Sequence, residues 1–369
     1  MQFHSDTAIM QHALLLAARG FGSVEPNPQV GAVIVSSDRH LIAEGWHAQF
    51  GGPHAEINAI TAAAGNTAGN DLFVTLEPCS HHGKTPPCVD ALLHAGFRRV
   101  VVGCPDPAPH AAGRGLQLLS NAGVVVETGL CKEAAEALIA PFRRQMLQRL
   151  PWVHAKWAMS LDGRIACDSG HSQWISSPVS RAAVHSLRGR VDAILTGAGT
   201  VRADNPLLTA RPPGPRTPLR VIFDSSGTAV TADSRLAQSL SDAPVLVCVS
   251  NRCSESNRLK LRNLGVDVFA ADSPNSVPPR TVLAELGRRG LTHVLIEAGP
   301  ALLGAFFDQQ AVDEVHIFVA PKILGGTHAR SAVAGFGQNC VPATAQLQHM
   351  HVRQLDTDVL IEGRWIRHE

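Results

Sequence analysis

His54-Ala55-Glu56 and Glu77-Pro78-Cys79-Ser80-His81-His82-Gly83-Lys84-Thr85-Pro86-Pro87-Cys88 together bring an imidazole, two thiols and a carboxylate into one stretch of chain. His54, Cys79 and Cys88 offer three protein ligands. A catalytic zinc uses three, because water fills its fourth tetrahedral position, whereas a structural zinc takes a fourth protein ligand. Glu56 follows the first ligand by two residues and is placed to move protons rather than to bind metal.

The order H-x-E followed by P-C is typical of zinc deaminases, so we interpret the stretch as a hydrolytic deaminase site. The spacing departs from the usual C-x-x-C, because eight residues separate Cys79 from Cys88. His81 and His82 lie in this interval and are alternative ligands, although we expect them to line the substrate entrance or hold the loop. The competing interpretation is a helix start with a surface histidine and two inert, buried cysteines.

Length and composition restrict the class of protein. A chain of 369 residues suggests two domains, and 45% apolar with 17% charged residues is typical of a soluble globular protein. No apolar run reaches the roughly 18 residues of a membrane helix, and the N-terminus lacks the basic region of a signal peptide. We therefore expect a cytoplasmic protein without membrane contact, whose eight scattered cysteines do not form a disulfide framework.

Hydrophobic periodicity in the first half alternates strands with helices, which predicts a three-layer α/β sandwich. His54 and both cysteines then fall where strands lead into helices. Asp6 is the expected N-cap of the first helix, and the break at Leu150-Pro151-Trp152 predicts domains 1–147 and 151–369. The expected helices are 7–19, 56–64, 88–95, 114–122 and 134–147, and the expected strands are 30–35, 41–46, 71–76, 99–103 and 124–128.

The second half repeats the alternation, with strands expected at 152–158, 191–196, 219–223, 245–249, 293–296 and 312–319, and helices at 178–188, after the cap Ser177, and at 283–289. Two strand–glycine–helix junctions, 197–200 and 299–304, are of the kind that lets backbone N–H groups approach a phosphate. They favour a dinucleotide, but no G-x-G-x-x-G follows the first strand, so this is not a standard Rossmann fingerprint.

Arginines in the second half are candidates for binding a phosphate, although a solvated basic face is the alternative for any one of them. The loop from Asp204 to Arg211 places an acid, a rigid turn and a cation together, where a capped surface turn is the competing interpretation. The candidate cations are Arg188, Arg202, Arg211 and Arg216.

These motifs resemble, over nearly the whole chain, the bifunctional deaminase/reductase of riboflavin biosynthesis, in which the widened Cys79–Cys88 spacing is itself a feature. The resemblance implies a cytidine-deaminase-like three-layer α/β/α domain followed by a dihydrofolate-reductase-like α/β domain. It rests on Pro26-Asn27-Pro28, His54-Ala55-Glu56, the Glu77–Cys88 motif, Ser160-Leu161-Asp162-Gly163-Arg164, Ser172-Gln173-Trp174, the Asp204–Arg211 loop and Glu297-Ala298-Gly299-Pro300.

The resemblance also implies two consecutive reactions on a small phosphoribosylaminopyrimidine. Zinc would support removal of the 2-amino group of 2,5-diamino-6-(5-phosphoribosylamino)pyrimidin-4-one, and NADPH would reduce the ribosyl to a ribityl chain. Zinc would be held by His54, Cys79 and Cys88, with Glu56 as proton shuttle. NADPH would contact Ala158, Trp174, Thr200, Asp204, Ser225, Gly299, Pro300, Ala301, Leu302, Leu303, Gly304 and Ala305, and the reductase substrate would contact Ser172, Arg188, Leu208, Arg211 and Glu297.

We expect a homo-oligomer, either a dimer or a tetramer. Ser225, Ser250 and Arg252, at the ends of predicted strands, are candidates for the 2′-phosphate of NADPH. One rival hypothesis is a tRNA-type nucleobase deaminase with an RNA-binding second half, which the net charge of +1, the 5% aromatic content and the absence of tyrosine disfavour. Another is a non-catalytic zinc protein, for which Glu56 would have no use.

Overall fold

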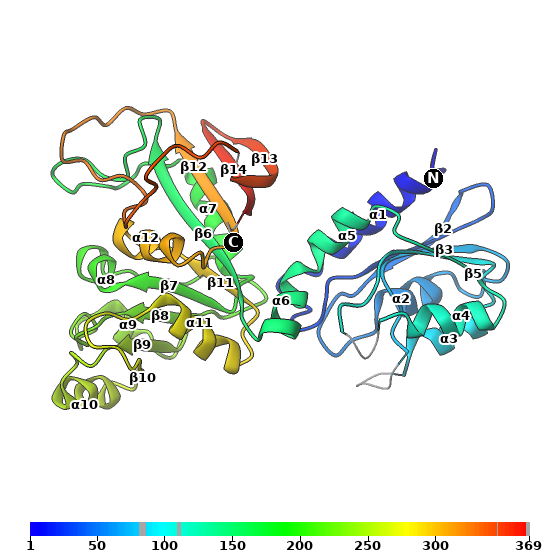
Figure 1. Cartoon of the computed structure of the whole chain (residues 1–369), viewed down its shortest axis with the longest axis horizontal. Coiled ribbons are helices and arrows are strands. Elements are labelled where there is room, and N and C mark those ends of the chain that lie inside the picture. Colours follow the sequence, from blue (N-terminus) through cyan, green and yellow to red (C-terminus); the bar gives the residue numbers. More distant parts are fainter. Residues whose placement is uncertain (81–85, 109–111, 345, 367–369) are drawn as a thin grey trace. The chain divides into compact units, whose positions relative to one another are not determined.

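The computed structural model describes residues 1–80, 86–108, 112–344 and 346–366. The chain divides into two compact units, Met1–Arg149 and Leu150–Glu369 (Figure 1). Each unit has its own mixed α/β architecture, so the expected fold class is confirmed. Among the described residues, no helix combines the length and apolar character needed to cross a bilayer.

The first unit is built on a five-stranded sheet in the order β2-β1-β3-β4-β5. β1 pairs antiparallel with both β2 and β3, while β3, β4 and β5 run parallel. Its strands are β1 (Gly31–Val35), β2 (Leu41–Trp46), β3 (Asp71–Leu76), β4 (Arg99–Cys104) and β5 (Val125–Thr128), and its helices are α1 (Asp6–Ala18), α2 (Ala55–Ala62), α3 (Cys88–Ala95), α4 (Arg114–Asn121), α5 (Lys132–Leu138) and α6 (Ala140–Gln148).

Helices cover both faces of this sheet, as the three-layer prediction required. α1 packs Ile9, Met10 and Leu16 against one face, through Val33 and Phe73. The opposite face packs against α2, α3 and α4, and Figure 1 shows α1 and α5 on the far side of the sheet from these three helices. β1 and β3 are buried along their whole length because helices lie on both sides of them.

Two local predictions in this unit are wrong. The N-cap of α1 is Ser5, whose hydroxyl accepts the Ala8 N–H at 3.1 Å, whereas Asp6 pairs with Arg39 and Arg99. The helix expected over 134–147 is two helices, which meet at Ile139. Pro141 explains the break, because proline lacks the N–H that would continue the first helix and is well tolerated in the first turn of the second.

The second unit contains a nine-stranded sheet in the order β10-β9-β8-β7-β11-β6-β12-β14-β13. The strands from β10 to β12 run parallel, and β14 and β13 complete one edge with antiparallel pairings. The strands are β6 (Trp152–Ser160), β7 (Ala193–Gly197), β8 (Leu219–Phe223), β9 (Val245–Val249), β10 (Asp267–Ala270), β11 (His293–Ile296), β12 (Glu314–Ala320), β13 (Leu347–Leu355) and β14 (Asp358–Trp365), and the helices are α7 (Pro178–Arg188), α8 (Ala198–Asp204), α9 (Arg235–Gln238), α10 (Glu255–Asn263), α11 (Pro279–Arg288) and α12 (Pro300–Asp308).

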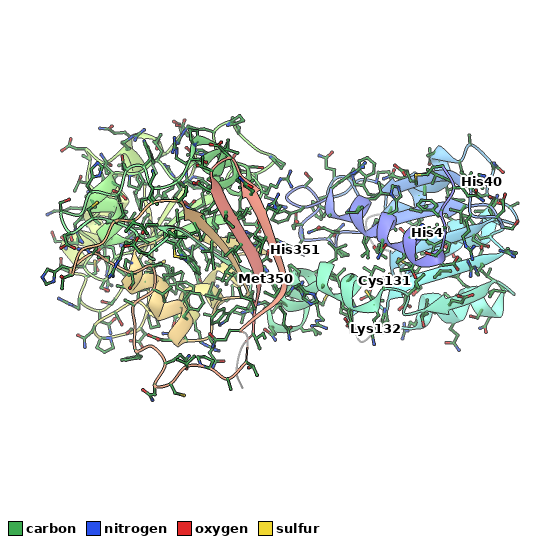
Figure 2. The ribbon with its side chains drawn as sticks, turned by 90° about the horizontal axis from the view of Figure 1, so that it is seen from above. His4, His40, Cys131, Lys132, Met350 and His351 are labelled. Atoms are coloured by element: carbon green, nitrogen blue, oxygen red, sulfur yellow. The ribbon has the colours of Figure 1, made fainter. Side chains whose placement is uncertain are left out.

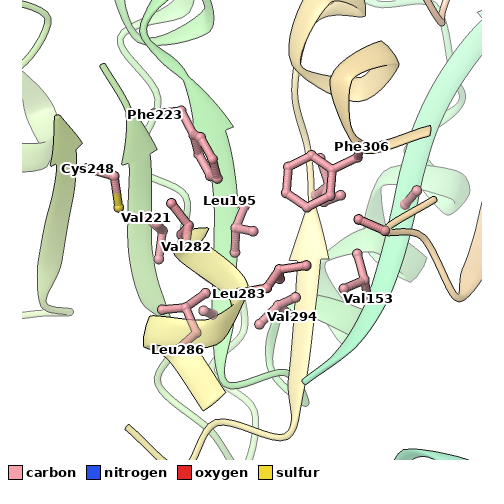
Figure 3. Close-up of a cluster of buried hydrophobic side chains, with 14 of the residues drawn as sticks. Val153, Leu195, Val221, Phe223, Cys248, Val282, Leu283, Leu286, Val294 and Phe306 are labelled. Carbon is pink, nitrogen blue, oxygen red and sulfur yellow. The ribbon is translucent and has the colours of Figure 1, made fainter. Parts of the chain in front are cut away.

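The main core of this unit lies between one face of the sheet and the helices α11 and α12. Phe223 from β8 and Phe306 from α12 meet edge to face with centroids 5.7 Å apart, and Leu283 and Leu286 of α11 pack beside them (Figure 3). Full burial of each such side chain stabilises the fold by about 1.5–3 kcal/mol. The other face is covered in part by α7, whose Val184 packs on β12 and β14.

The edge strands β13 and β14 were not expected from the sequence. Most side chains of β13 are exposed on both faces, including Met350 and His351, which Figure 2 labels on this outermost strand. A strand exposed on both faces has no apolar alternation, so periodicity does not predict it.

Gly45→Ala tests the approach of β2 to α2. A Cβ on Gly45 would lie 2.5 Å from the Ala59 nitrogen and 2.6 Å from the Ala55 carbonyl oxygen, so α2 would have to move. We expect a loss of about 1–3 kcal/mol in the free energy of unfolding, as for other overpacked sites. Chemical denaturation measures it, with Gly199→Ala as control because no atom lies within 4 Å there. Equal midpoints for Gly45→Ala and the unsubstituted chain would contradict the packing.

Candidate active sites

The first unit brings the three expected ligand residues together. His54 is the N-cap of α2, Cys88 is the first residue of α3, and Cys79 follows the end of β3. His54 Nδ1 lies 3.2 Å from Cys88 Sγ and 3.6 Å from Cys79 Sγ, and the three ligand atoms lie within 4.8 Å of one another. Chain segments that are remote in sequence therefore converge because strand ends and helix starts share one edge of the sheet.

The spacing of these atoms fits a tetrahedral zinc. With Zn–S and Zn–N bonds of about 2.3 and 2.0–2.1 Å, tetrahedral angles place sulfur and nitrogen roughly 3.6 Å apart. The observed separations of 3.2 and 3.6 Å agree with this value within a few tenths of an ångström. One imidazole and two thiolates are also ligands that zinc favours, and three of them leave a fourth position for water.

The pKa values of the two thiols and of the neighbouring Glu56 carboxyl are all shifted from their usual values. A hydrogen bond with Cys88 lowers the pKa of Cys79 to about 4, and the same bond, with burial, raises the pKa of Cys88. The Cys88 backbone N–H, at the start of α3, donates to Cys79 Sγ at 3.3 Å, so a helix start also favours the Cys79 thiolate. Glu56 lies in the first turn of α2 and is 3% exposed, and burial raises the pKa of its carboxyl.

His47 contacts His54, the first predicted ligand, and the residue before it. Sequence reasoning did not identify His47 as part of the site. Its Nδ1 lies 3.0 Å from the carbonyl oxygen of Pro53, the residue before His54, and Asn27 Nδ2 donates to its Nε2 at 3.1 Å. The ring packs edge-on against His54 with centroids 5.3 Å apart, and burial lowers the pKa of His47, which favours the neutral form. The sequence signal was weak: a histidine directly after β2.

Glu77 fixes the backbone that leads into Cys79. Its buried carboxylate accepts backbone N–H groups from Asp106 at 3.1 Å, Gly113 at 3.0 Å and Gly115 at 3.1 Å. A side chain at Gly115 would collide with the Pro78 carbonyl oxygen at 2.3 Å, so glycine permits this close approach. His81 and His82, the alternative ligands, lie outside the described residues.

In the second unit, the two glycine junctions lie side by side. Gly197 ends β7 and Gly299 caps α12 after β11, and these strands are neighbours. A Cβ at Gly299 would come within 3.9 Å of Thr200 Oγ1, and one at Gly197 within 3.7 Å of Leu302. Of the predicted cofactor residues, Thr200 and the first turns of α12 therefore share the carboxyl end of the sheet, where open α/β sheets bind ligands.

A partly buried ion pair connects two predicted substrate residues. Arg188 Nε and Nη2 donate to the Glu297 carboxylate at 2.5 and 2.9 Å, and Arg188 Nη1 donates to the Thr209 carbonyl oxygen at 3.2 Å. Lys156 on β6 is a third charge in this group: burial lowers its pKa, while Glu297 acts in the opposite direction. Sequence reasoning missed Lys156, because the charges that surround it, Glu297 and Arg188, belong to other elements of the fold.

The Asp204–Arg211 loop accepts a hydrogen bond from a fully buried arginine of β8. Arg220 of β8 donates to the Leu207 carbonyl oxygen at 3.1 Å and to Ser239 Oγ at 2.7 Å. Leu208 is buried at a φ of 53°, and Arg211 is exposed, with Nη1 donating to Thr209 Oγ1 at 3.0 Å. Among the described residues no carboxylate pairs with Arg211, which is therefore a better phosphate ligand than Arg188.

Three further predicted cofactor or substrate residues lie along β6 and the loop after it. Ala158 is on β6, and Ser172 and Trp174 lie in the loop before α7. The Trp174 ring is 62% exposed, with the Arg181 guanidinium 4.6 Å from its centroid. The Ser160–Arg164 motif forms a turn in which Asp162 accepts the Leu324 and Gly325 N–H groups at 3.1 and 2.8 Å.

The candidates for the 2′-phosphate meet at the ends of β8 and β9. Ser250 Oγ donates to the Ser225 carbonyl oxygen at 3.1 Å and accepts the Arg252 N–H at 3.2 Å. Ser250 is fully buried and engaged in both directions, so it supports the backbone, while Ser225 is partly exposed and Arg252 exposed. The exposed Arg202 and Asp204 lie in the helix α8.

Two family models match the chain. The cytidine and deoxycytidylate deaminase zinc-binding region covers residues 3–104, and the RibD C-terminal domain covers residues 151–361. The fold, the metal-ligand cluster and these two matches together define the class of protein. It combines a zinc-dependent deaminase and a reductase in one chain.

Relatives narrow the class to one family. The chain is 38% identical to the riboflavin biosynthesis protein RibD of Bacillus amyloliquefaciens, covering 95% of this chain and 94% of that one, and 37% identical to RibD of Escherichia coli, covering 96% and 98%. It is similar in structure to RibD of Acinetobacter baumannii (TM-score 0.81, 38% identity, 98% and 99% covered) and to the Thermotoga maritima deaminase/reductase (0.82, 36%, 98% and 98%). The chain belongs to the RibD family of bifunctional riboflavin-biosynthesis enzymes, which use zinc and NADPH.

Glu77→Gln tests the support of the metal-ligand loop. The amide retains one acceptor oxygen but turns an NH₂ group toward backbone donors, and each buried donor left without an acceptor costs about 1–3 kcal/mol. We expect a lower free energy of unfolding and weaker zinc retention, measured by denaturation and metal analysis.

Glu127→Gln is the matched control, since Glu127 is exposed and pairs with Arg99 at the surface, where such pairs contribute about 0–1 kcal/mol. If Glu77→Gln behaved like this control in both measurements, Glu77 would not be the support of the loop.

Proposed function

We propose that His54, Cys79 and Cys88 hold the catalytic zinc and that Glu56 moves the proton in deamination of 2,5-diamino-6-(5-phosphoribosylamino)pyrimidin-4-one. The observation that carries this proposal is the convergence of one imidazole nitrogen and two sulfurs within 4.8 Å, beside a buried carboxyl. The similar Thermotoga maritima protein is a diaminohydroxyphosphoribosylaminopyrimidine deaminase, which supports the choice of substrate.

Glu56 has the position and the environment of a proton shuttle. A zinc ion held by His54, Cys79 and Cys88 would supply an activated water, whose pKa it would lower to about 7. Glu56 would accept a proton from that water and return it to the departing amine, which would leave as ammonia. Because burial raises the pKa of Glu56, its protonated and ionised forms are closer in free energy, as a group that both accepts and donates requires.

In the second unit, the proposed reaction reduces the ribosyl group of the deaminated product. NADPH held at the two glycine junctions would supply the hydride for C1 of the opened, imine-like sugar. Arg211 binds the 5-phosphate of the substrate, and the Arg188–Glu297 pair orients the sugar beside the two glycine junctions. Lys156 adds a positive charge next to this pair, and its lowered pKa brings it nearer to the range in which it can donate a proton.

The first experiment is direct assay of the purified chain. Incubation with the diaminopyrimidinone phosphate and NADPH should release ammonia and then consume the reduced nicotinamide, followed by its absorbance. The RNA-editing alternative is not favoured, because the second unit matches the RibD C-terminal domain rather than an RNA-binding module. The homo-oligomer and the cytoplasmic location stay predictions.

Glu56→Gln and Arg211→Ala should separate the two reactions. Glu56→Gln retains size but cannot shuttle a proton, so deamination should fall on the order of 10²-fold or more, while reduction of pre-deaminated substrate persists. Arg211→Ala should weaken reduction by about 1.5–3 kcal/mol through loss of a charge-assisted phosphate contact, with ammonia release unchanged. Each variant is assayed for both activities, each with its own substrate.

Arg190→Ala is the control for Arg211→Ala, because Arg190 is exposed and is not among the residues predicted to contact NADPH or the substrate. Loss of reduction in a folded Glu56→Gln variant, or loss of deamination in Arg211→Ala, would contradict two separate sites.

Arg252→Ala tests recognition of the 2′-phosphate. If Arg252 and Ser225 bind that phosphate, the KM for NADPH should rise by the equivalent of about 1.5–3 kcal/mol, while the KM for NADH stays constant. Arg262→Ala, an exposed arginine on α10, is the control. An equal effect on both nucleotides, or none on NADPH, would place the 2′-phosphate elsewhere.

A further inference from the structure

A second cluster of metal-ligating side chains lies in the reductase unit, outside the cofactor and substrate residues. His154 on β6 and Glu314 and His316 on β12 offer three ligand atoms within 4.8 Å of one another. Glu314 pairs with His154 across the two parallel strands, and His316 lies two residues further on, so all three side chains project from the same face of the sheet. The register of the strands, rather than a local motif, creates the cluster.

The separations fit a small divalent ion. His154 Nδ1 lies 3.1 Å from His316 Nε2 and 3.7 Å from Glu314 Oε2, and His316 Nε2 lies 3.6 Å from Glu314 Oε1. Bonds of about 2.0–2.2 Å at tetrahedral angles would place such ligand atoms roughly 3.4 Å apart. The two distances to Glu314 involve different oxygens of its carboxylate, so binding of an ion would also require this carboxylate to turn.

The groups behind the three ligands are those that metal sites use to orient them. His316 Nδ1 lies 2.9 Å from Glu362 Oε1 on the neighbouring β14, which is the histidine–carboxylate arrangement found behind metal-bound imidazoles. His154 Nε2 lies 3.0 Å from His293 Nδ1 on β11, and Trp152 Nε1 donates to Glu314 Oε2 at 3.1 Å. Each first ligand thus has a partner that holds its orientation.

Burial and charge also suit an ion. His154 and His316 are 4% and 6% exposed, while the Glu314 side chain remains 29% exposed and leaves a path from solvent. The Glu314 carboxylate faces the position, and the Glu362 carboxylate lies behind His316. Arg353 pairs with Glu362 at 2.7 Å, and Arg364 lies over the Trp152 ring at 5.2 Å, so two arginines partly offset the acids.

The cluster is separate from the reductase site along the strands. Glu314 begins β12 and His154 is the third residue of β6, whereas the glycine junctions and Glu297 follow the carboxyl ends of β7 and β11. In a parallel sheet these are opposite ends of the strands, so the three ligands lie outside the predicted NADPH and substrate contacts. Lys156, which pairs with His316 across β6 and β12, lies between the cluster and the Arg188–Glu297 pair.

We propose that His154, Glu314 and His316 form a second divalent-metal site, of His₂Glu composition, which binds zinc or a similar first-row transition ion and ties β6 to β12. Two imidazoles select such ions over Mg²⁺ and Ca²⁺, which prefer oxygen ligands. With three protein ligands, the fourth position is left for water. Without an ion, the same atoms form a hydrogen-bonded chain from His293 through His154 and His316 to Glu362, which is the competing account.

Zinc stoichiometry in the full-length chain distinguishes the two accounts. After dialysis against metal-free buffer, the unsubstituted chain should retain two zinc ions, and Glu314→Gln and Cys88→Ser one each. The double variant should retain none. In the Cys88→Ser background, Zn²⁺ should raise the unfolding temperature, and Glu314→Gln should remove that increase.

A second variant distinguishes loss of the metal site from misfolding of the protein. Glu362→Gln removes no ligand, and in the Cys88→Ser background it should raise the dissociation constant for Zn²⁺ about 10–100-fold, as changes behind metal-bound histidines do. His328→Gln, an exposed histidine beyond the far end of β12, should leave that constant unchanged.

One zinc ion in the unsubstituted chain, retained by Glu314→Gln and lost in Cys88→Ser, would overturn the proposal, as would two ions in Glu314→Gln. If Cys88→Ser kept two ions while Glu314→Gln kept one, the second site would stand and the deaminase ligand set would fail.

Discussion

The carboxylate of Glu77 is buried where β3 ends, and three backbone N–H groups replace the water that a charged group requires. These donors belong to the segment from Asp106 to Gly115, which follows the neighbouring strand β4. The interaction therefore fastens two strand ends together directly beside Cys79. The metal-ligand cluster depends on it, because a thiolate contributes to a tetrahedral site only if its backbone is held within a fraction of an ångström of the required position.

In the reductase unit, a buried positive charge fixes a loop, as the buried negative charge of Glu77 does in the first unit. Arg220 is fully buried and donates to carbonyl and hydroxyl groups of the chain around it, among them the Leu207 carbonyl of the predicted substrate loop. Arg188 is partly buried, pairs with Glu297 and donates to the carbonyl oxygen of Thr209 in the same loop. In both units, a charge that would be costly to bury is satisfied by hydrogen bonds to a loop, and these bonds hold the loop beside a predicted site.

Sequence patterns predicted most elements whose faces differ in polarity or that lie buried, and β2, β3, α3 and β11 have the expected bounds. They missed the exposed β13, and they joined α5 to α6 because apolar spacing continues across Pro141. Local motifs predicted the His54–Cys79–Cys88 cluster, because the H-x-E and P-C patterns identify its residues although the two motifs lie 25 residues apart. His47, Lys156 and the His154–Glu314–His316 cluster were not predictable, because each acquires its meaning from strand register or from a partner remote in the chain.

Cys79 and Cys88 are held together by contacts at the two ends of the segment between them. The Cys88 N–H donates to Cys79 Sγ, and the Val89 N–H donates to the Cys79 carbonyl oxygen at 3.2 Å. The metal geometry therefore sets the distance between the ends and leaves the length of the intervening chain free. Closing a longer loop costs little, about 0.6 kcal/mol for each doubling. A segment of eight residues, in place of the usual two, is therefore compatible with the same relative position of the two sulfurs.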